Sequence, residues 1–158
     1  MSSLRLPVSA WIESFNTRDL RRIVSLYSED AELFDSGMRR PRRGRLEIER
    51  WFDLRFNSMP SNIYTPHLSR ASMDETQANV PWTLAGRGPR LLGLPWLARP
   101  FHVEGVSHFV LRDGLIYRQR GDYDHLAVLK QILPPLALLP TPVVLRIYYL
   151  YLWRHGLY

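Results

Sequence analysis

Residues 101–123 read FHVEGVSHFVLRDGLIYRQRGDY, and this stretch decides the class of fold. Apolar and polar side chains alternate on both sides of Asp113-Gly114, a dipeptide that favours the tight turn of a β-hairpin. The stretch therefore predicts two antiparallel strands, over 101–111 and 115–123. The same period of two predicts further strands over 63–73 and 77–84.

Outside this region the apolar residues recur with helical spacing. Val8, Trp11, Ile12 and Phe15 form one stripe directly after Pro7, a residue that suits the first turn of a helix. Similar spacings predict helices over 20–27, 48–56 and 125–133, and a short strand over 31–35. Helices followed by antiparallel strands favour an α+β fold, in which a long curved sheet wraps against three helices. Such a sheet leaves a pocket at its open end, suited to a small apolar ligand.

Composition narrows the class of protein further. A chain of 158 residues with 46% hydrophobic content supports one domain with a substantial core. Cysteine is absent, so disulfides, thiolate nucleophiles and cysteine metal sites are excluded, and no histidines stand at metal-ligand spacing. The first residues lack the pattern of a secretory signal, and we expect the protein in the cytoplasm.

The formal charge of +6 comes almost entirely from arginine. The densest cluster lies in residues 39–45, which form a loop interrupted by Pro41 and Gly44. This cluster is either a solvated basic loop or a patch for phosphate groups. No RNA-binding signature with interleaved aromatic residues accompanies it, so we expect no nucleic-acid partner.

Two stretches carry a resemblance to known families. Residues 11–37 (WIESFNTRDLRRIVSLYSEDAELFDSG) and 42–52 (RRGRLEIERWF) resemble the opening of ketosteroid isomerases and SnoaL-like polyketide cyclases. Residues 90–133 are similar to the second half of the SnoaL-like cyclases. The resemblance spans about residues 8–133 and implies the cone-shaped fold of the nuclear-transport-factor-2-like superfamily. It also implies acid–base chemistry without a cofactor or a metal.

The resemblance suggests one candidate base at the end of the first strand. Asp35 falls where a ketosteroid isomerase keeps its general-base aspartate, although it can equally cap the turn at Ser36-Gly37. The isomerase oxyanion donors correspond here to Trp11 and Ser107, which disfavours isomerisation of the steroid type.

A second candidate pair comes from the cyclases, which place an aspartate on the last strand and a histidine on the strand before it. Asp122 and His108 each stand one residue away from these positions, and a shift of one residue turns a side chain to the opposite face. A bulge at Gly121 would bring Asp122 back toward the pocket. Epoxide hydrolysis, the activity of the similar limonene-epoxide-hydrolase-like proteins, is disfavoured because the Arg-x-Asp pair is missing near Asn79.

Aromatic residues supply the remaining candidate contacts with a substrate, although aromatic residues in strands are commonly core. The candidate contacts are Trp11, Tyr27, Trp82, Ser107 and Tyr123. The leading hypothesis is a cofactor-independent cyclase or isomerase for a polyketide- or terpenoid-like carbonyl compound of secondary metabolism. The alternative is a non-catalytic ligand-binding or dimerisation module of the same fold. Under both hypotheses we expect a homodimer, as is usual for relatives of this fold.

The chain divides at about residue 135. Residues 1–135 form the predicted SnoaL-like domain, and residues 136–158 form an apolar, aromatic extension punctuated by prolines. Within it, residues 143–153 have the composition of a helix that is too short to cross a membrane. The extension covers a dimer interface or the mouth of the pocket, makes peripheral contact with a membrane, or docks a partner protein.

Overall fold

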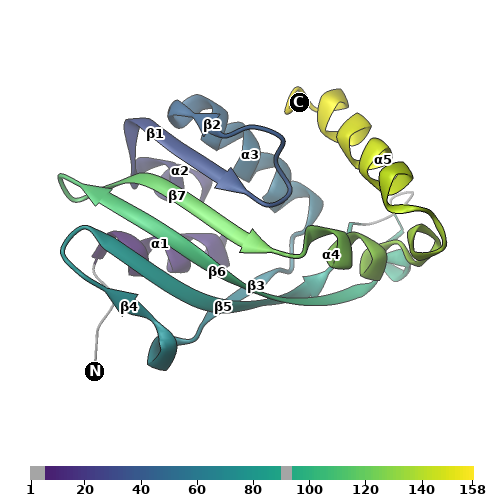
Figure 1. Ribbon diagram of the computed structural model, residues 1–158, viewed down its shortest axis with the longest axis horizontal. Helices are drawn as coiled ribbons and strands as arrows, with labels where there is room; N and C mark the ends of the chain where they lie inside the picture. The colour runs from purple at the N-terminus through teal and green to yellow at the C-terminus, as the bar shows by residue number, and fades with distance from the viewer. Residues whose placement is uncertain (1–5, 90–93) are drawn as a thin grey trace.

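The computed structural model describes residues 6–89 and 94–158 and has the predicted α+β architecture. One curved, open sheet runs through the molecule, and the three N-terminal helices cover one of its faces (Figure 1). The strand order is β2-β1-β7-β6-β5-β3, and the short strand β4 pairs with β5. The core lies between this sheet and the helices.

The N-terminal helices follow the predicted apolar stripes. They are α1 (Leu6–Thr17), α2 (Leu20–Ser25) and α3 (Gly44–Ser58). The Asp19 side chain caps α2 by accepting a hydrogen bond of 2.9 Å from the backbone N–H of Arg22. The prediction of a helix as far as residue 27 is wrong at its end, because Tyr27 already belongs to the first strand.

The strands are β1 (Tyr27–Asp35), β2 (Arg42–Arg43), β3 (Ile63–Pro66), β4 (Ser72–Met73), β5 (Gln77–Arg87), β6 (Pro100–Arg112) and β7 (Leu115–Tyr123). The hairpin between β6 and β7 is confirmed, since Asp113 and Gly114 have positive φ angles of 53° and 76°. The expected single strand over 63–73 is wrong, because a short 3-10 helix, η1 (Leu68–Arg70), separates β3 from β4. β1 pairs in parallel with β7, whereas the other pairs are antiparallel.

The chain ends in helical segments at one end of the sheet. A short 3-10 helix, η3 (Pro95–Leu97), precedes β6, and β7 leads into α4 (His125–Ile132), η4 (Pro134–Leu138) and α5 (Thr141–Arg154). Figure 1 shows α5 lying across that end of the molecule, beyond α4. Among the described residues, no helix combines the length and the apolar content needed to cross a bilayer.

The arginine-rich loop holds this C-terminal segment in place. Arg42 is buried to 1% exposure, donates a hydrogen bond to the carbonyl oxygen of Leu157 and lies over the ring of Trp51. Arg39 stacks on the rings of Tyr149 and Tyr158, at 5.1 Å and 4.6 Å. These two arginines therefore make contacts within the chain, and the loop is not wholly solvated.

Candidate active site

The predicted pocket between the sheet and the N-terminal helices is a small aromatic cavity. Its volume is about 40 Å³, which is room for water molecules rather than for a polyketide. Its lining residues are Trp11, Phe15, Leu33, Asp35, Trp51, Phe52, Arg55, Tyr64, Trp82, Leu84, Ser107, Gln119, Gly121 and Tyr123. Asp35 is the one carboxylate among these described residues.

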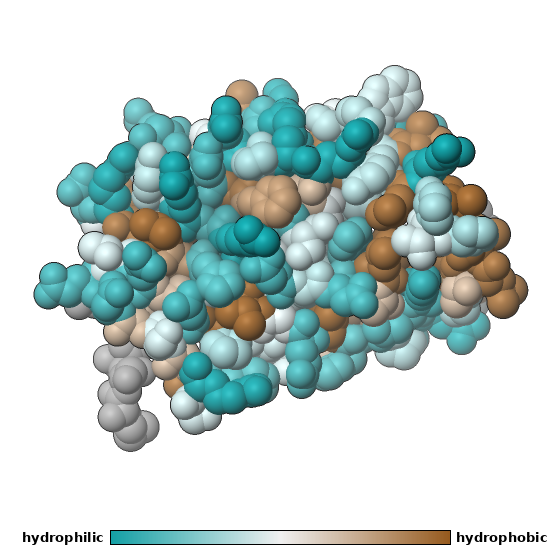
Figure 2. Space-filling view, in the orientation of Figure 1, coloured by the Kyte–Doolittle hydropathy of each residue, from teal (hydrophilic) through white to brown (hydrophobic). Residues whose placement is uncertain are grey.

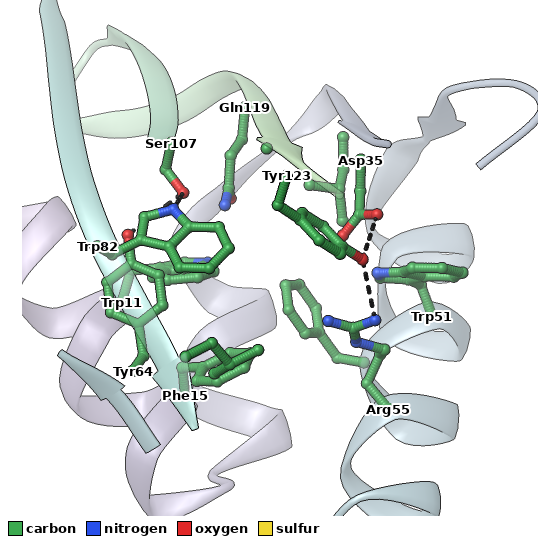
Figure 3. Close-up of a pocket in the computed structure, with 14 residues that line it drawn as sticks. Trp11, Phe15, Asp35, Trp51, Arg55, Tyr64, Trp82, Ser107, Gln119 and Tyr123 are labelled. Atoms are coloured by element: carbon green, nitrogen blue, oxygen red, sulfur yellow. Dashed lines mark hydrogen bonds between the residues drawn. The ribbon is translucent and has the colours of Figure 1, made fainter. Parts of the chain in front are cut away.

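Asp35 lies at the end of β1 in a network of three hydrogen bonds. Its Oδ1 accepts 2.8 Å bonds from the Tyr123 hydroxyl and from the backbone N–H of Gly37. Arg55 in turn donates to the Tyr123 oxygen at 3.2 Å, and its guanidinium lies over the ring of Trp51 (Figure 3). No hydrogen bond to Asp35 Oδ2 is found among the described residues, so this oxygen is available to accept a proton.

The C-terminal helix contributes a further hydroxyl to the same place. A Cβ atom added at Gly37 would lie 2.7 Å from Tyr148 Oη, 3.3 Å from Asp35 Oδ1 and 3.5 Å from Tyr123 Oη. Three oxygens from β1, β7 and α5 therefore converge around this glycine. The ring of His125 packs against Tyr148 at 5.7 Å, and its buried Nε2 has no hydrogen-bond partner among the described residues.

The surroundings shift the pKa values of the groups around Asp35. Burial and the Asp35 carboxylate raise the pKa of Tyr123 well above its ordinary value, against the opposing charge of Arg55. Tyr123 is therefore a neutral donor. Burial lowers the pKa of Arg55 while Tyr123 and Asp35 raise it, and the net shift is upward, so the guanidinium stays charged. Burial also lowers the pKa of His125, which keeps its imidazole neutral near pH 7.

Four of the five predicted contact residues line the cavity, but their polar atoms are already bonded. Trp11 donates to the Tyr27 hydroxyl at 2.8 Å, and Tyr27 donates to Gln119. Ser107 accepts bonds from Trp82 at 2.9 Å and from Tyr64 at 3.3 Å. Tyr27 itself is fully buried and is not among the lining residues, so the structure does not bring it to the cavity with the other four.

Asp122 and His108 lie on the outer face of the sheet, away from the cavity. The register pairs Val106 with Asp122 and Ser107 with Gly121 without interruption, so the expected bulge at Gly121 is wrong. The Asp122 carboxylate instead accepts from Arg120 at 2.9 Å and lies 3.4 Å from His108 Nε2. Both side chains are more than 40% exposed. Asp122 and His108 therefore face away from the cavity, as the alternation of side chains along a regular strand implies when no bulge is present.

Three groups near Asp35 were not predicted from the sequence: Arg55, His125 and Tyr148. Arg55 had a usable signal, because it follows Trp51 by four residues and so shares its face of α3. No pattern in the sequence pointed to Tyr148, because its position depends on how α5 packs against the rest of the protein. Within residues 6–89 and 94–158, no cluster of three or more metal-ligating side chains occurs.

Solved structures with the same fold are numerous. One is a hypothetical protein with a ketosteroid isomerase-like fold from Catenulispora acidiphila, in complex with trimethylamine (TM-score 0.69, 19% identity, covering 82% of this chain and 93% of the other). Another is a proposed SnoaL-like polyketide cyclase from Shewanella putrefaciens (TM-score 0.67, 12% identity, covering 80% of this chain and 93% of the other). A third is a proposed polyketide cyclase from Xanthomonas campestris (TM-score 0.63, 21% identity, covering 80% of this chain and 93% of the other).

At these identities the similarity to solved structures shows the fold alone. Among curated protein sequences, none matches the chain. The sequence profile of the SnoaL-like domain does match, over residues 8–119, and this range starts within α1 and ends within β7. Since the match spans well over half of the 158 residues, the protein belongs to the SnoaL-like domain family.

Proposed function

We propose that the protein is a cofactor-independent cyclase or isomerase that acts on a small apolar carbonyl compound, with Asp35 as its acid–base group. One observation carries this proposal: Asp35 is the one carboxylate among the described lining residues, and its Oδ2 has no hydrogen-bond partner there. Membership of the SnoaL-like family supports the same class of reaction.

In the proposed reaction, Asp35 Oδ2 takes a proton from the carbon next to the carbonyl group. The electron pair of the broken C–H bond forms a C=C bond, and the carbonyl oxygen becomes an enolate oxygen. The N–H groups of Arg55 that Tyr123 does not use can donate to this oxygen and stabilise its charge. When the substrate carries a C=C bond next to the deprotonated carbon, Asp35 then returns the proton to the far carbon of that bond, the double bond shifts toward the carbonyl and the C=O bond re-forms, which gives an isomer. Alternatively, the enolate carbon attacks a second carbonyl of the substrate, which gives a ring, and the new alkoxide takes the proton.

Tyr123 has a positioning role in this scheme. Its hydroxyl donates to Asp35 Oδ1 and accepts from Arg55, so it holds the base and the cation at a defined separation. Because its raised pKa keeps it protonated, it remains a hydrogen-bond donor and does not compete for the substrate proton.

The alternative function, a non-catalytic ligand-binding module, is favoured by a different observation. The cavity holds only about 40 Å³, and the Trp11 and Trp82 indoles already donate their N–H groups to Tyr27 and Ser107. A protein with this interior can bind an apolar molecule near the mouth of the cone without transforming it.

Hydrogen–deuterium exchange distinguishes the two functions. β-Tetralone, a compact ketone, is incubated with the protein in D₂O, and loss of the α-proton signal is followed by NMR. We expect the protein to accelerate exchange and Asp35→Asn to reduce the acceleration by about 10²–10⁴-fold. Asp122→Asn is the matched control and should exchange at the native rate. Equal exchange by the native protein and Asp35→Asn contradicts the proposed mechanism, and binding without exchange supports the ligand-binding module.

A further inference from the structure

A second, larger cavity lies outside the cone, between α3, α4, η4 and α5. Its volume is about 320 Å³, at the lower end of the range of small-molecule pockets. Leucine, isoleucine, valine, methionine and tyrosine side chains form most of its wall, for example Leu54 and Met59 from α3, Leu129 from α4 and Ile147 from α5. Arg55 is the one charged residue among the described lining residues.

The contacts of α5 make this cavity part of the folded protein rather than a gap beside a loose tail. Val144 and Leu152 of α5 are buried to 0% and 2% exposure, and Leu157 beyond it is buried to 3%. The helix is tied to α3 by a 2.8 Å hydrogen bond between the hydroxyls of Ser58 and Tyr151. Its far end is held by the bond from Arg42 to Leu157.

Arg55 connects the two cavities, since it lines both. This half-buried cation uses one N–H for Tyr123, and its hydrogen-bond connection to Asp35 runs through that hydroxyl, although the Asp35 charge also acts on it. Among the described residues no carboxylate lies within ion-pair distance of Arg55, although exposed arginines such as Arg40 and Arg112 have such partners. A cation that is partly removed from water favours an anionic or carbonyl oxygen as its partner.

We propose that the cavity between α3, α4 and α5 binds an elongated amphiphile, whose apolar body lies against α5 and whose carboxylate or carbonyl oxygen meets Arg55. An apolar wall with a single cation, shared with the inner cavity, fits this chemistry. The inference rests on the proposed function only in one respect, which is that the head group held by Arg55 would lie beside Asp35.

Calorimetric titration with dodecanoate, below its micelle concentration, tests the binding without requiring turnover. We expect dodecanoate to bind, dodecanol to bind about tenfold to a hundredfold more weakly because it lacks the charge, and acetate not to bind. Arg55→Met should remove the preference for dodecanoate over dodecanol. Equal affinity for the two probes, or no binding of dodecanoate, overturns the proposal.

Two variants locate the bound chain. Ile147→Trp fills the cavity from α5 and should weaken dodecanoate binding at least tenfold. Leu150→Trp is the matched control, because Leu150 is on the same helix, 63% exposed and not a lining residue. This variant should bind dodecanoate with the affinity of the native protein. If Ile147→Trp does not fold, Leu54→Trp fills the cavity from α3. Native affinity in a folded cavity-filling variant overturns the proposal.

The test also separates a free amphiphile from a membrane and from catalysis. Figure 2 shows apolar side chains gathered at the end of the molecule where α5 lies, and the exposed apolar residues of this helix include Leu150 and Trp153. Binding to phosphatidylglycerol vesicles but not to dodecanoate would assign this surface to a membrane and overturn the cavity proposal. Dodecanoate binding without β-tetralone exchange leaves the cavity proposal standing and contradicts only the proposed catalysis.

Discussion

Gly37 lies where β1, β7 and α5 meet, and its missing side chain leaves space for the Tyr148 hydroxyl. A Cβ atom at this position would lie only 2.7 Å from Tyr148 Oη, which is too short for any real contact, so a larger residue must displace Tyr148 or the turn that follows β1. The φ angle of Gly37 is not positive, and an alanine is therefore compatible with the backbone there. The requirement for glycine is one of space.

We expect Gly37→Ala to destabilise the protein by about 1–3 kcal/mol, because it crowds a packed site. Tyr148→Phe removes the oxygen that the new methyl group meets. The double variant should therefore lose less stability than the sum of the losses of the two single variants. Urea denaturation of all four proteins measures a coupling energy, expected at about 0.5–3 kcal/mol.

The control for this cycle is Gly121→Ala. A Cβ at Gly121 meets no atom within 4 Å, and the residue faces the cavity, so the substitution should change stability little. Additive losses for Gly37→Ala and Tyr148→Phe would show that the two residues are not in contact.

Helix α3 carries the cation of the candidate site, and one side chain anchors its first turn. Glu47 accepts from the backbone N–H of Arg43 at 2.9 Å and pairs with Arg40 through both carboxylate oxygens, at 2.7 Å and 3.0 Å. The bond from Arg40 is the main reason that the pKa of Glu47 is lowered to about 2. Trp51 and Arg55 follow Glu47 at intervals of four residues along α3, so the anchor sets the direction in which both enter the core.

The lowered pKa makes the contribution of Glu47 dependent on pH. The folded protein binds the Glu47 proton less tightly than the unfolded chain, whose pKa is near 4.5, so the stabilisation is complete above pH 4.5 and is lost as the pH falls toward 2. Because the side chain is one-third exposed, we expect only about 1 kcal/mol.

Glu47→Gln should therefore be less stable than the native protein by about 1 kcal/mol at pH 7, and the difference should shrink as the pH approaches about 2. Urea denaturation at a series of pH values measures this difference. Glu49→Gln, at an exposed position of the same helix, should show no such trend. If the difference in stability between Glu47→Gln and the native protein were the same at every pH, the ionised Glu47 carboxylate would not be what stabilises the first turn of α3.

At the scale of the whole molecule, we propose that the protein forms a homodimer through the outer face of its sheet. This face combines half-buried apolar residues such as Val106 and Phe34 with charged pairs, including Arg120–Asp122 and Arg43–Glu32. In this arrangement His108 and Asp122, which the cyclase comparison suggested for catalysis, belong to the contact surface.

Light scattering after size-exclusion chromatography tests the dimer and locates it. Val106→Glu adds an unpaired charge opposite Asp122 and should shift the protein to a monomer. Leu150→Glu on the exposed face of α5 should leave the dimer intact. The reverse result would place the interface on the C-terminal extension, and a native monomer would contradict dimerisation altogether.

The local pattern of the chain was sufficient for the class of fold and for most of its elements. The alternation around Asp113-Gly114 and the apolar stripe of α1 depend on residues close together in sequence, and both are confirmed. Alternation also implied that Ser107 faces inward and Asp122 outward. The bulge that was invoked to reverse Asp122 is wrong, because the β6–β7 register is regular at Gly121.

The candidate site required the tertiary structure, because its groups come from elements far apart in the chain. Asp35 could be recognised from its family position, but its partners Tyr123, Arg55 and Tyr148 are brought to it by β1–β7 pairing, by the direction of α3 and by the fold-back of α5. The fold-back itself depends on Arg42, which the sequence showed only as part of a basic loop. Hydrophobic periodicity records which face of an element is buried and not what that face is buried against, so only packing could reveal this site and the cavity beside it.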